Sequence, residues 1–190
     1  MINDLRYLKI EKNIRQAFLK LLDEKKYPKI TVTDICKRAS CSRNAFYLHY
    51  ESKENLYDAI ILDIVLDIEK SCLPVVDKFS DIGHTENRAY VSNILSAVES
   101  HRPVLKQLLE NEQVAFSKYL KKVLVEAMLS NAKNLQEEAD IDYIHYFAGG
   151  ITSFIEYWIT ESAYDIETAR LSLFEVILSP PYPKSQESTN

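Results

Sequence analysis

The sequence predicts an all-α fold, and three observations support this prediction. Only 3 glycines and 6 prolines occur in 190 residues, so few residues favour tight turns, and long helices with short connections are expected. No window has the alternating, β-branched, glycine-bounded pattern of a strand. Apolar residues recur instead at helical spacing over most of the chain. A chain of this length can bury a substantial core.

The first helix is expected over residues 4–26. Leu8, Ile14 and Phe18 recur at helical spacing and form part of an apolar stripe, whereas most of the lysines lie off it. Pro28 ends this helix, because the residue before a proline is disfavoured in helical geometry. We expect the stripe to pack against the next two helices and to complete a three-helix module.

Two short helices joined by a tight turn are expected next. Thr31 and Asp34 fit a capping box, with a hydroxyl at the cap and a carboxylate three residues on. Ser40 and Cys41 then interrupt the apolar pattern, and Ser42 is a second candidate cap. This arrangement is typical of a helix-turn-helix, whose second helix suits the major groove of DNA.

Seven polar residues are candidate contacts to double-stranded DNA: Thr33, Ser42, Arg43, Asn44, Tyr47, His49 and Lys53. Arg43 suits guanine O6 and N7, and Asn44 suits adenine N6 and N7, both in the major groove. Tyr47, His49 and Lys53 suit phosphates, because polar and cationic groups beside a helix N-terminus commonly bind them. The alternative for Arg43 and Asn44 is a solvated surface side chain and for His49 a capped surface histidine, whereas without the motif Tyr47 would be assigned to the core.

A set of fixed offsets runs through this region: Thr31-Val32, Asp34-Ile35, Ala39, Ser42, Phe46-Tyr47, His49-Tyr50, Lys53-Glu54 and Leu56. These residues resemble the signature of the tetracycline-repressor (TetR) family, and the resemblance extends from about Ile14 to Leu62. That family usually has glycine where Ser40 stands, and often where Asn44 stands. Ser40 would therefore adopt a strained left-handed conformation, or the turn would be reshaped. Asn44 adds a polar group at the groove, so no operator sequence transfers from the family.

Further helices are expected over residues 53–73, 87–101, 103–111, 112–135, 141–160 and 166–178. Pro103 would occupy the first turn of the third of these. We divide the chain into a helix-turn-helix head (residues 1–52), a helical effector-binding and dimerisation body (53–179) and a polar tail (180–190).

The final two helices resemble the C-terminal region of a TetR-family branch through Gly149-Gly150 and Trp158. The resemblance implies that these helices pair with their copies in a homodimer. The candidate interface residues are Phe154, Trp158, Leu173 and Ile177.

Aromatic residues of the body are candidates for an effector pocket between residues 53–73 and 87–160. The candidate wall residues are Tyr119, Tyr146 and Phe147, although each of them taken alone is better explained as ordinary core. The resemblance implies an unknown small-molecule effector there.

Charge is divided unevenly along the chain. The net charge is −5, yet residues 1–60 carry +4 and residues 61–190 carry −9, which suits a DNA-binding head on an acidic body. Three cysteines without metal-ligand spacing, no signal peptide and no membrane-length apolar run favour a cytoplasmic protein without a membrane partner.

Catalytic and metal-binding patterns were also considered. Asp142 and His145, with His84 and His101, do not form a recognised metal set, and no cofactor motif or nucleophile–base arrangement occurs. We therefore expect no enzyme, no metal and no cofactor. The preferred hypothesis is a ligand-responsive repressor that binds a near-palindromic operator as a dimer. The alternatives are a DNA-bound architectural or partner-recruiting protein without an effector, and a helical-bundle enzyme for which no catalytic cluster is found.

Overall fold

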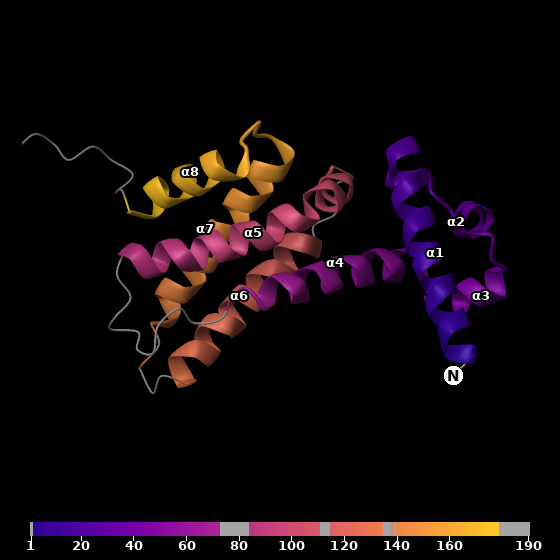
Figure 1. Cartoon of the computed structure of the whole chain (residues 1–190), viewed down its shortest axis with the longest axis horizontal. Helices are drawn as coiled ribbons and strands as arrows, with labels where there is room; N and C mark the ends of the chain where they lie inside the picture. The colour runs from indigo at the N-terminus through magenta and orange to yellow at the C-terminus, as the bar shows by residue number, and fades with distance from the viewer. Residues whose placement is uncertain (1, 73–83, 111–114, 135–137, 139, 179–190) are drawn as a thin grey trace, which may run out of the picture. The chain divides into compact units, whose positions relative to one another are not determined.

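A computed structural model describes residues 2–72, 84–110, 115–134, 138 and 140–178. The elements in chain order are α1 (Ile2–Glu24), a 3₁₀ turn η1 (Tyr27–Lys29), α2 (Val32–Ala39), α3 (Arg43–Tyr47), α4 (Lys53–Glu69), α5 (His84–Leu109), α6 (Ala115–Asn134), α7 (Ile141–Thr160) and α8 (Ile166–Leu178) (Figure 1). No strand occurs in these ranges. The prediction of an all-α fold is confirmed.

The predicted break between the helices over residues 87–101 and 103–111 does not occur. The sequence suggested separate helices on either side of Arg102, but α5 continues through Pro103 to Leu109. A proline removes one backbone donor and crowds the preceding turn, which can bend a helix without ending it. Tertiary packing of this segment outweighs the local penalty, because Leu105 and Leu108 beyond the proline are fully buried.

The chain folds into two compact units. The first contains residues 1–66 and 101–119, and the second contains residues 67–100 and 120–190. The first unit thus includes the predicted head and adds most of α4 to it. The division at residue 52 stays a prediction, and the predicted tail over residues 180–190 lies outside the described residues.

The core of the head forms where α1, α2 and α3 pack together (Figure 1). Ile14 and Phe18 of α1, Ile35 of α2 and Phe46 of α3 have no exposed surface. The predicted packing of the first apolar stripe against the two short helices is therefore confirmed. Burying four such side chains stabilises the head by about 1.5–3 kcal/mol each before conformational entropy is subtracted.

A polar cluster ties α1 to α4 and to the segment after α3. Arg15 Nε donates to the Tyr50 hydroxyl at 2.8 Å, and Arg15 Nη1 donates to Asp63 Oδ2 at 2.6 Å. Glu11 accepts from both Arg15 Nη2 and the Tyr50 hydroxyl, each at 3.2 Å. Burial raises the pKa of Tyr50 to about 12, so its hydroxyl stays protonated and can donate to Glu11. These hydrogen bonds hold α1, α4 and the segment that follows α3 together.

In the second unit, α7 and α8 share a core. Trp158 is fully buried, and its Nε1 donates to the Tyr164 carbonyl at 3.0 Å in the connection between the two helices. Ala169 and Leu173 of α8 are buried at 0% and 2% exposure. Within the described ranges, no helix combines the length and the apolar character that crossing a membrane requires.

Candidate nucleic-acid interface

The turn between α2 and α3 is a Schellman motif. The Cys41 amide donates to the Cys36 carbonyl at 3.0 Å, and the Ser40 amide donates to the Lys37 carbonyl at 3.4 Å. Ser40 has φ 53° and ψ 44°, and it alone among the described residues has a positive φ. Of the two alternatives stated for Ser40, the left-handed conformation is the one observed. Its backbone is strained because a Cβ is disfavoured there.

Both short helices begin at side-chain caps that the sequence predicted. The Thr31 hydroxyl accepts from the Asp34 amide at 3.2 Å, and Asp34 Oδ2 accepts from the Thr31 amide at 2.9 Å. Hydrogen bonds from Lys25 and Thr31 hold the pKa of Asp34 well below its usual range. At the start of α3, the Ser42 hydroxyl accepts from the Ala45 amide at 3.0 Å. The orientation of α3 is therefore fixed by local hydrogen bonds.

Candidate base-reading residues lie exposed at the start of α3. Arg43 and Asn44 are its first two residues, while Phe46 faces inward with no exposed surface. Tyr47 is 48% exposed, and its hydroxyl accepts from Arg43 Nη2 at 3.4 Å. The short helix thus presents a guanidinium, an amide and a phenol to solvent. Thr33 in the first turn of α2 and Ser42 are exposed as well.

Leu48 is a candidate DNA contact that the sequence analysis did not identify. It follows α3 directly and is 75% exposed. An exposed leucine beside base-reading candidates can contact a thymine methyl group or a sugar. Its exposure could have been inferred from the sequence, because Leu48 lies between Tyr47 and His49 and the buried positions of the motif were already assigned to other residues.

His49 is half-buried against the first helix. Its ring lies on the Tyr7 ring, with centroids 3.8 Å apart, and the Tyr7 hydroxyl donates to the Leu48 carbonyl at 3.4 Å. Burial lowers the pKa of His49, so the imidazole is biased toward its neutral form. Nδ1 of His49 is buried without a hydrogen-bond partner within the described structure. The interaction with Tyr7 orients the residue that the sequence assigned to a phosphate.

Lys53 is bound within the protein. Its Nζ donates to the carbonyls of Ile30 at 3.0 Å and Tyr27 at 3.1 Å, and it lies 4.2 Å from the centre of the Tyr27 ring. Only 14% of its side chain is exposed. This ammonium binds the carbonyls of the first residue of η1 and of the residue that follows η1, and it joins that turn to α4. The phosphate contact predicted for Lys53 stays a prediction, and in this structure its charged group is held by backbone carbonyls.

Two parts of the chain match known families. Residues 14–60 match the model described as "Bacterial regulatory proteins, tetR family", and residues 87–168 match the model described as "Transcriptional regulator C-terminal region". The chain belongs to the TetR family of transcriptional regulators. TetR-family members are DNA-binding regulators and not enzymes.

Several TetR-type proteins are similar to this chain. The uncharacterized HTH-type transcriptional regulator YxbF of Bacillus subtilis (strain 168) is 27% identical over 156 residues, which are 80% of this chain and 40% of YxbF. This chain therefore spans less than half the length of that relative.

Two solved structures share the TetR fold. A TetR transcriptional regulator from Streptococcus agalactiae 2603V has a TM-score of 0.65 at 24% identity, covering 93% of this chain and 98% of its own. The dihydroxyacetone kinase operon activator DhaS has a TM-score of 0.60 at 15% identity, covering 89% and 94%. At these identities the likeness is one of fold alone.

The candidates for dimerisation in this TetR-family chain have different environments. Phe154 is half-buried, whereas Trp158 and Leu173 are buried in the chain's own core. Leu173 is 2% exposed, so in the single chain it faces the core and is not on an exposed face of α8. The side chain of Ile177 lies outside the described ones.

The candidate pocket residues do not gather at a described cavity. Tyr119 is half-buried in the first unit, while Tyr146 in the second unit is 79% exposed. Phe147 is 7% exposed, and its ring stacks on Tyr143 with centroids 5.7 Å apart. The effector pocket that they would line stays a prediction.

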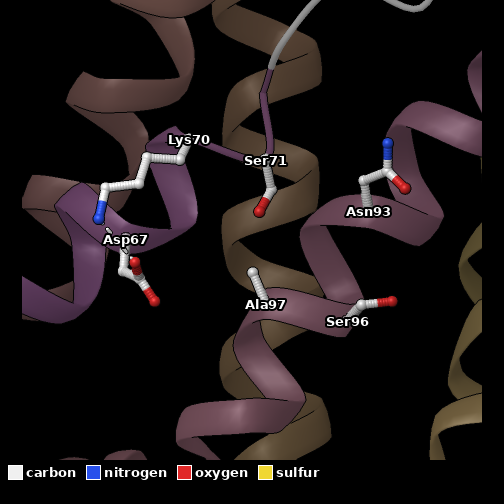
Figure 2. Close-up of a pocket in the computed structure, with 6 residues that line it drawn as sticks. All are labelled: Asp67, Lys70, Ser71, Asn93, Ser96 and Ala97. Carbon is white, nitrogen blue, oxygen red and sulfur yellow. Dashed lines mark hydrogen bonds and ion pairs between the residues drawn. The ribbon is translucent and has the colours of Figure 1, made fainter.

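Two grooves lie within the second unit. One of about 460 Å³ is lined by Asp67, Lys70, Ser71, Asn93, Ser96 and Ala97. Figure 2 shows Lys70 turned toward Asp67, with which it pairs at 2.8 Å. The other, of about 240 Å³, lies between α5 and α8 beside Arg88 and Phe174. Polar side chains dominate the first groove, which therefore differs from the aromatic pocket expected from the sequence.

Proposed function

We propose that this TetR-family chain is a ligand-responsive repressor that binds a near-palindromic operator as a homodimer. The observation that carries the proposal is the exposure of Arg43 and Asn44 in the first turn of α3, above a fully buried Phe46. An α-helix held in this way can enter a major groove with its N-terminal side chains at the base edges. The basic balance of residues 1–60 adds attraction to phosphates.

The dimer is supported by the outer face of α7. Tyr143, Tyr146, Gly150, Phe154 and Tyr157 follow one another at helical spacing on one side of this helix. Tyr143, Tyr146 and Tyr157 are 47%, 79% and 42% exposed, so an aromatic stripe faces solvent in the single chain. Such stripes favour contact with a partner surface.

Gly150 lies in the middle of this stripe. A Cβ added at Gly150 would meet nothing within 4 Å in the single chain. The missing side chain therefore leaves room for close approach of a second helix, at a cost of about 1 kcal/mol in helix propensity. Two heads held about 34 Å apart by such a dimer would reach successive major grooves on one face of DNA.

Regulation by a small molecule requires different affinities for two arrangements of the dimer. A ligand that binds both equally shifts nothing. The two grooves of the second unit are candidate places for it, in addition to the aromatic pocket predicted from the sequence. Since the similar structure DhaS is described as an operon activator, activation is the outcome that would replace repression in this proposal.

The deciding experiment is selection of bound duplexes from a random DNA pool with the full chain. We expect a half-site repeated in inverted orientation. Arg43→Ala should lose about 1–3 kcal/mol on that site and relax the preference at one base pair. Lys122→Ala in α6 removes a charge whose partner Glu126 lies on the same helix, and it serves as the control.

Selection without any enriched sequence would favour the architectural alternative. Equal losses by Arg43→Ala on selected and random duplexes would remove the base-reading role of Arg43. Transcription from a promoter bearing the selected site then distinguishes repression from activation.

A further inference from the structure

The turn of the helix-turn-helix contains a pair of neighbouring thiols. The Cys41 amide donates to the Cys36 carbonyl at 3.0 Å, and this six-residue hydrogen bond closes the Schellman motif. These are the two positions of the motif whose side chains meet. The Cys41 thiol is close enough to contribute to the raised pKa of the Cys36 thiol, and both cysteines are free.

The backbone hydrogen bond of the turn brings Cys41 back beside Cys36. A disulfide requires Cα atoms about 4.4–6.8 Å apart and Cβ atoms that face each other. Most pairs separated by five residues along a helix point to different sides, but the left-handed Ser40 reverses the chain and returns Cys41 to Cys36. The left-handed turn therefore brings these two cysteines near each other, which a pair five residues apart in a regular helix would not be.

We propose that Cys36 and Cys41 are a reversible oxidation site, at which a peroxide closes a disulfide across the turn and thereby weakens binding to the operator. The disulfide itself depends only on the two thiols, whereas its effect on DNA rests on the proposed function.

The reaction begins at Cys41, which is half-buried and so more accessible than Cys36 at 5% exposure. The Cys41 thiolate attacks one oxygen of hydrogen peroxide, the O–O bond breaks, and the departing hydroxide takes up a proton as water. The product is a sulfenic acid on Cys41. Cys36 then loses its proton and attacks that sulfur, the S–O bond breaks, and a second water leaves. Two thiols and one peroxide thus give one disulfide and two waters.

The roles of the two thiols follow from their surroundings. Burial, followed by the adjacent Cys41 thiol, raises the pKa of Cys36 to about 11, which leaves little of it as thiolate. Cys36 is therefore poorly suited to the first step and serves as the resolving thiol.

Closure of the disulfide changes the start of α3. Cys36 Sγ now donates to the Ser42 carbonyl at 3.8 Å, and this contact is lost when the thiol proton leaves. A disulfide holds its sulfurs about 2.05 Å apart, so the Cys36 and Cys41 side chains must approach each other. Ser42 caps α3, and Arg43 is its first residue. Recognition tolerates displacements of only about 0.5 Å, so a shift of the turn is sufficient to misplace Arg43.

Cys72 provides an internal comparison. It is buried at 2% exposure in the second unit, and its Sγ donates to the Ile68 carbonyl at 3.6 Å. Cys72→Ser should therefore leave the oxidation of the turn unchanged.

The experiment treats the full chain with hydrogen peroxide and follows two readouts. Trypsin cleaves after Lys29, Lys37, Arg38 and Arg43, so a disulfide between the two cysteines joins peptide 30–37 to peptide 39–43 in the mass spectrum. In parallel, fluorescence anisotropy measures the Kd for the selected operator before and after oxidation. We expect the joined peptides, at least a tenfold rise in Kd, and recovery of both with dithiothreitol.

Matched variants separate the steps. Cys41→Ser should bind the operator as the reduced wild type does and should not respond to peroxide, whereas Cys72→Ser should respond fully. Cross-links between two chains, or oxidation of Cys41 without joined peptides, would overturn the disulfide. Joined peptides without a change in Kd would overturn the regulatory effect. Failure of the reduced wild type to select any DNA would count against the proposed function, while the peptide map would still decide the thiol chemistry.

Discussion

Replacing Ser40 with glycine should stabilise the head. Ser40 occupies φ 53° and ψ 44°, where an L-residue with a Cβ is disfavoured by about 1–2 kcal/mol. Glycine relieves that strain but increases the freedom of the unfolded chain, which offsets about 0.4–1 kcal/mol. Ser40 is exposed, and its hydroxyl has no hydrogen bond within the described structure, so little else is lost. The expected net gain is about 0.5–1 kcal/mol in the free energy of unfolding.

The assay is urea unfolding followed by far-ultraviolet circular dichroism, with hydrogen exchange of the α2–α3 amides as a local probe. Trp158 fluorescence, which reports on the second unit, should not change with Ser40→Gly. A gain of this size corresponds to a rise in Tm of about 1–4 °C for a chain of this length. Exchange at the Cys41 amide, which donates within the turn, should slow by a factor of about 2–5.

Ala39→Gly is the matched control, one residue earlier. Ala39 is helical and buried, so glycine there should destabilise by about 1 kcal/mol or more. Ser40→Ala keeps the strained Cβ and should leave the stability nearly unchanged. The reasoning is refuted if Ser40→Gly leaves the unfolding midpoint unchanged or lowers it as Ala39→Gly does.

Three further predictions concern other elements. Lys53→Met should destabilise the head by about 1.5–3 kcal/mol, because two carbonyls lose a charged donor. The dependence of DNA affinity on salt concentration should stay unchanged in Lys53→Met. A slope of log K against log salt lowered by about one unit would instead support the phosphate contact predicted from the sequence. Tyr146→Glu on the exposed stripe of α7 should give monomers in sedimentation at micromolar concentration, whereas Lys122→Ala should not; an unchanged mass would exclude this stripe from the dimer interface. Burial lowers the pKa of His49 from its ordinary 6.5, so the unfolded chain binds a proton more readily than the folded one. The His49 contribution to stability should therefore be present above pH 6.5 and be lost as the pH falls from there through the folded pKa, a dependence that urea titrations should find reduced in His49→Gln.

The sequence was most informative where structure depends on neighbours in the chain. The caps at Thr31 and Ser42 were predicted, and the left-handed Ser40 was one of the two alternatives stated for the turn, because each rests on hydrogen bonds between residues three to five positions apart. The exposure of Arg43 and Asn44 follows from the same spacing once the cap is placed. The local structure of the helix-turn-helix could therefore be predicted from the sequence without any tertiary contact.

The tertiary structure decided what burial and distant partners determine. Lys53 looked like a phosphate contact, but its ammonium is bound by Tyr27, which lies 26 residues earlier. Both sides of α7 carry apolar or aromatic residues, so periodicity alone could not show that Trp158 faces inward and Tyr146 outward. Pro103 likewise ends a helix by local rules, yet α5 passes through it because leucines beyond it are buried. Local hydrogen bonds depend on residues that are close in the sequence, whereas burial depends on which remote segment covers a side chain.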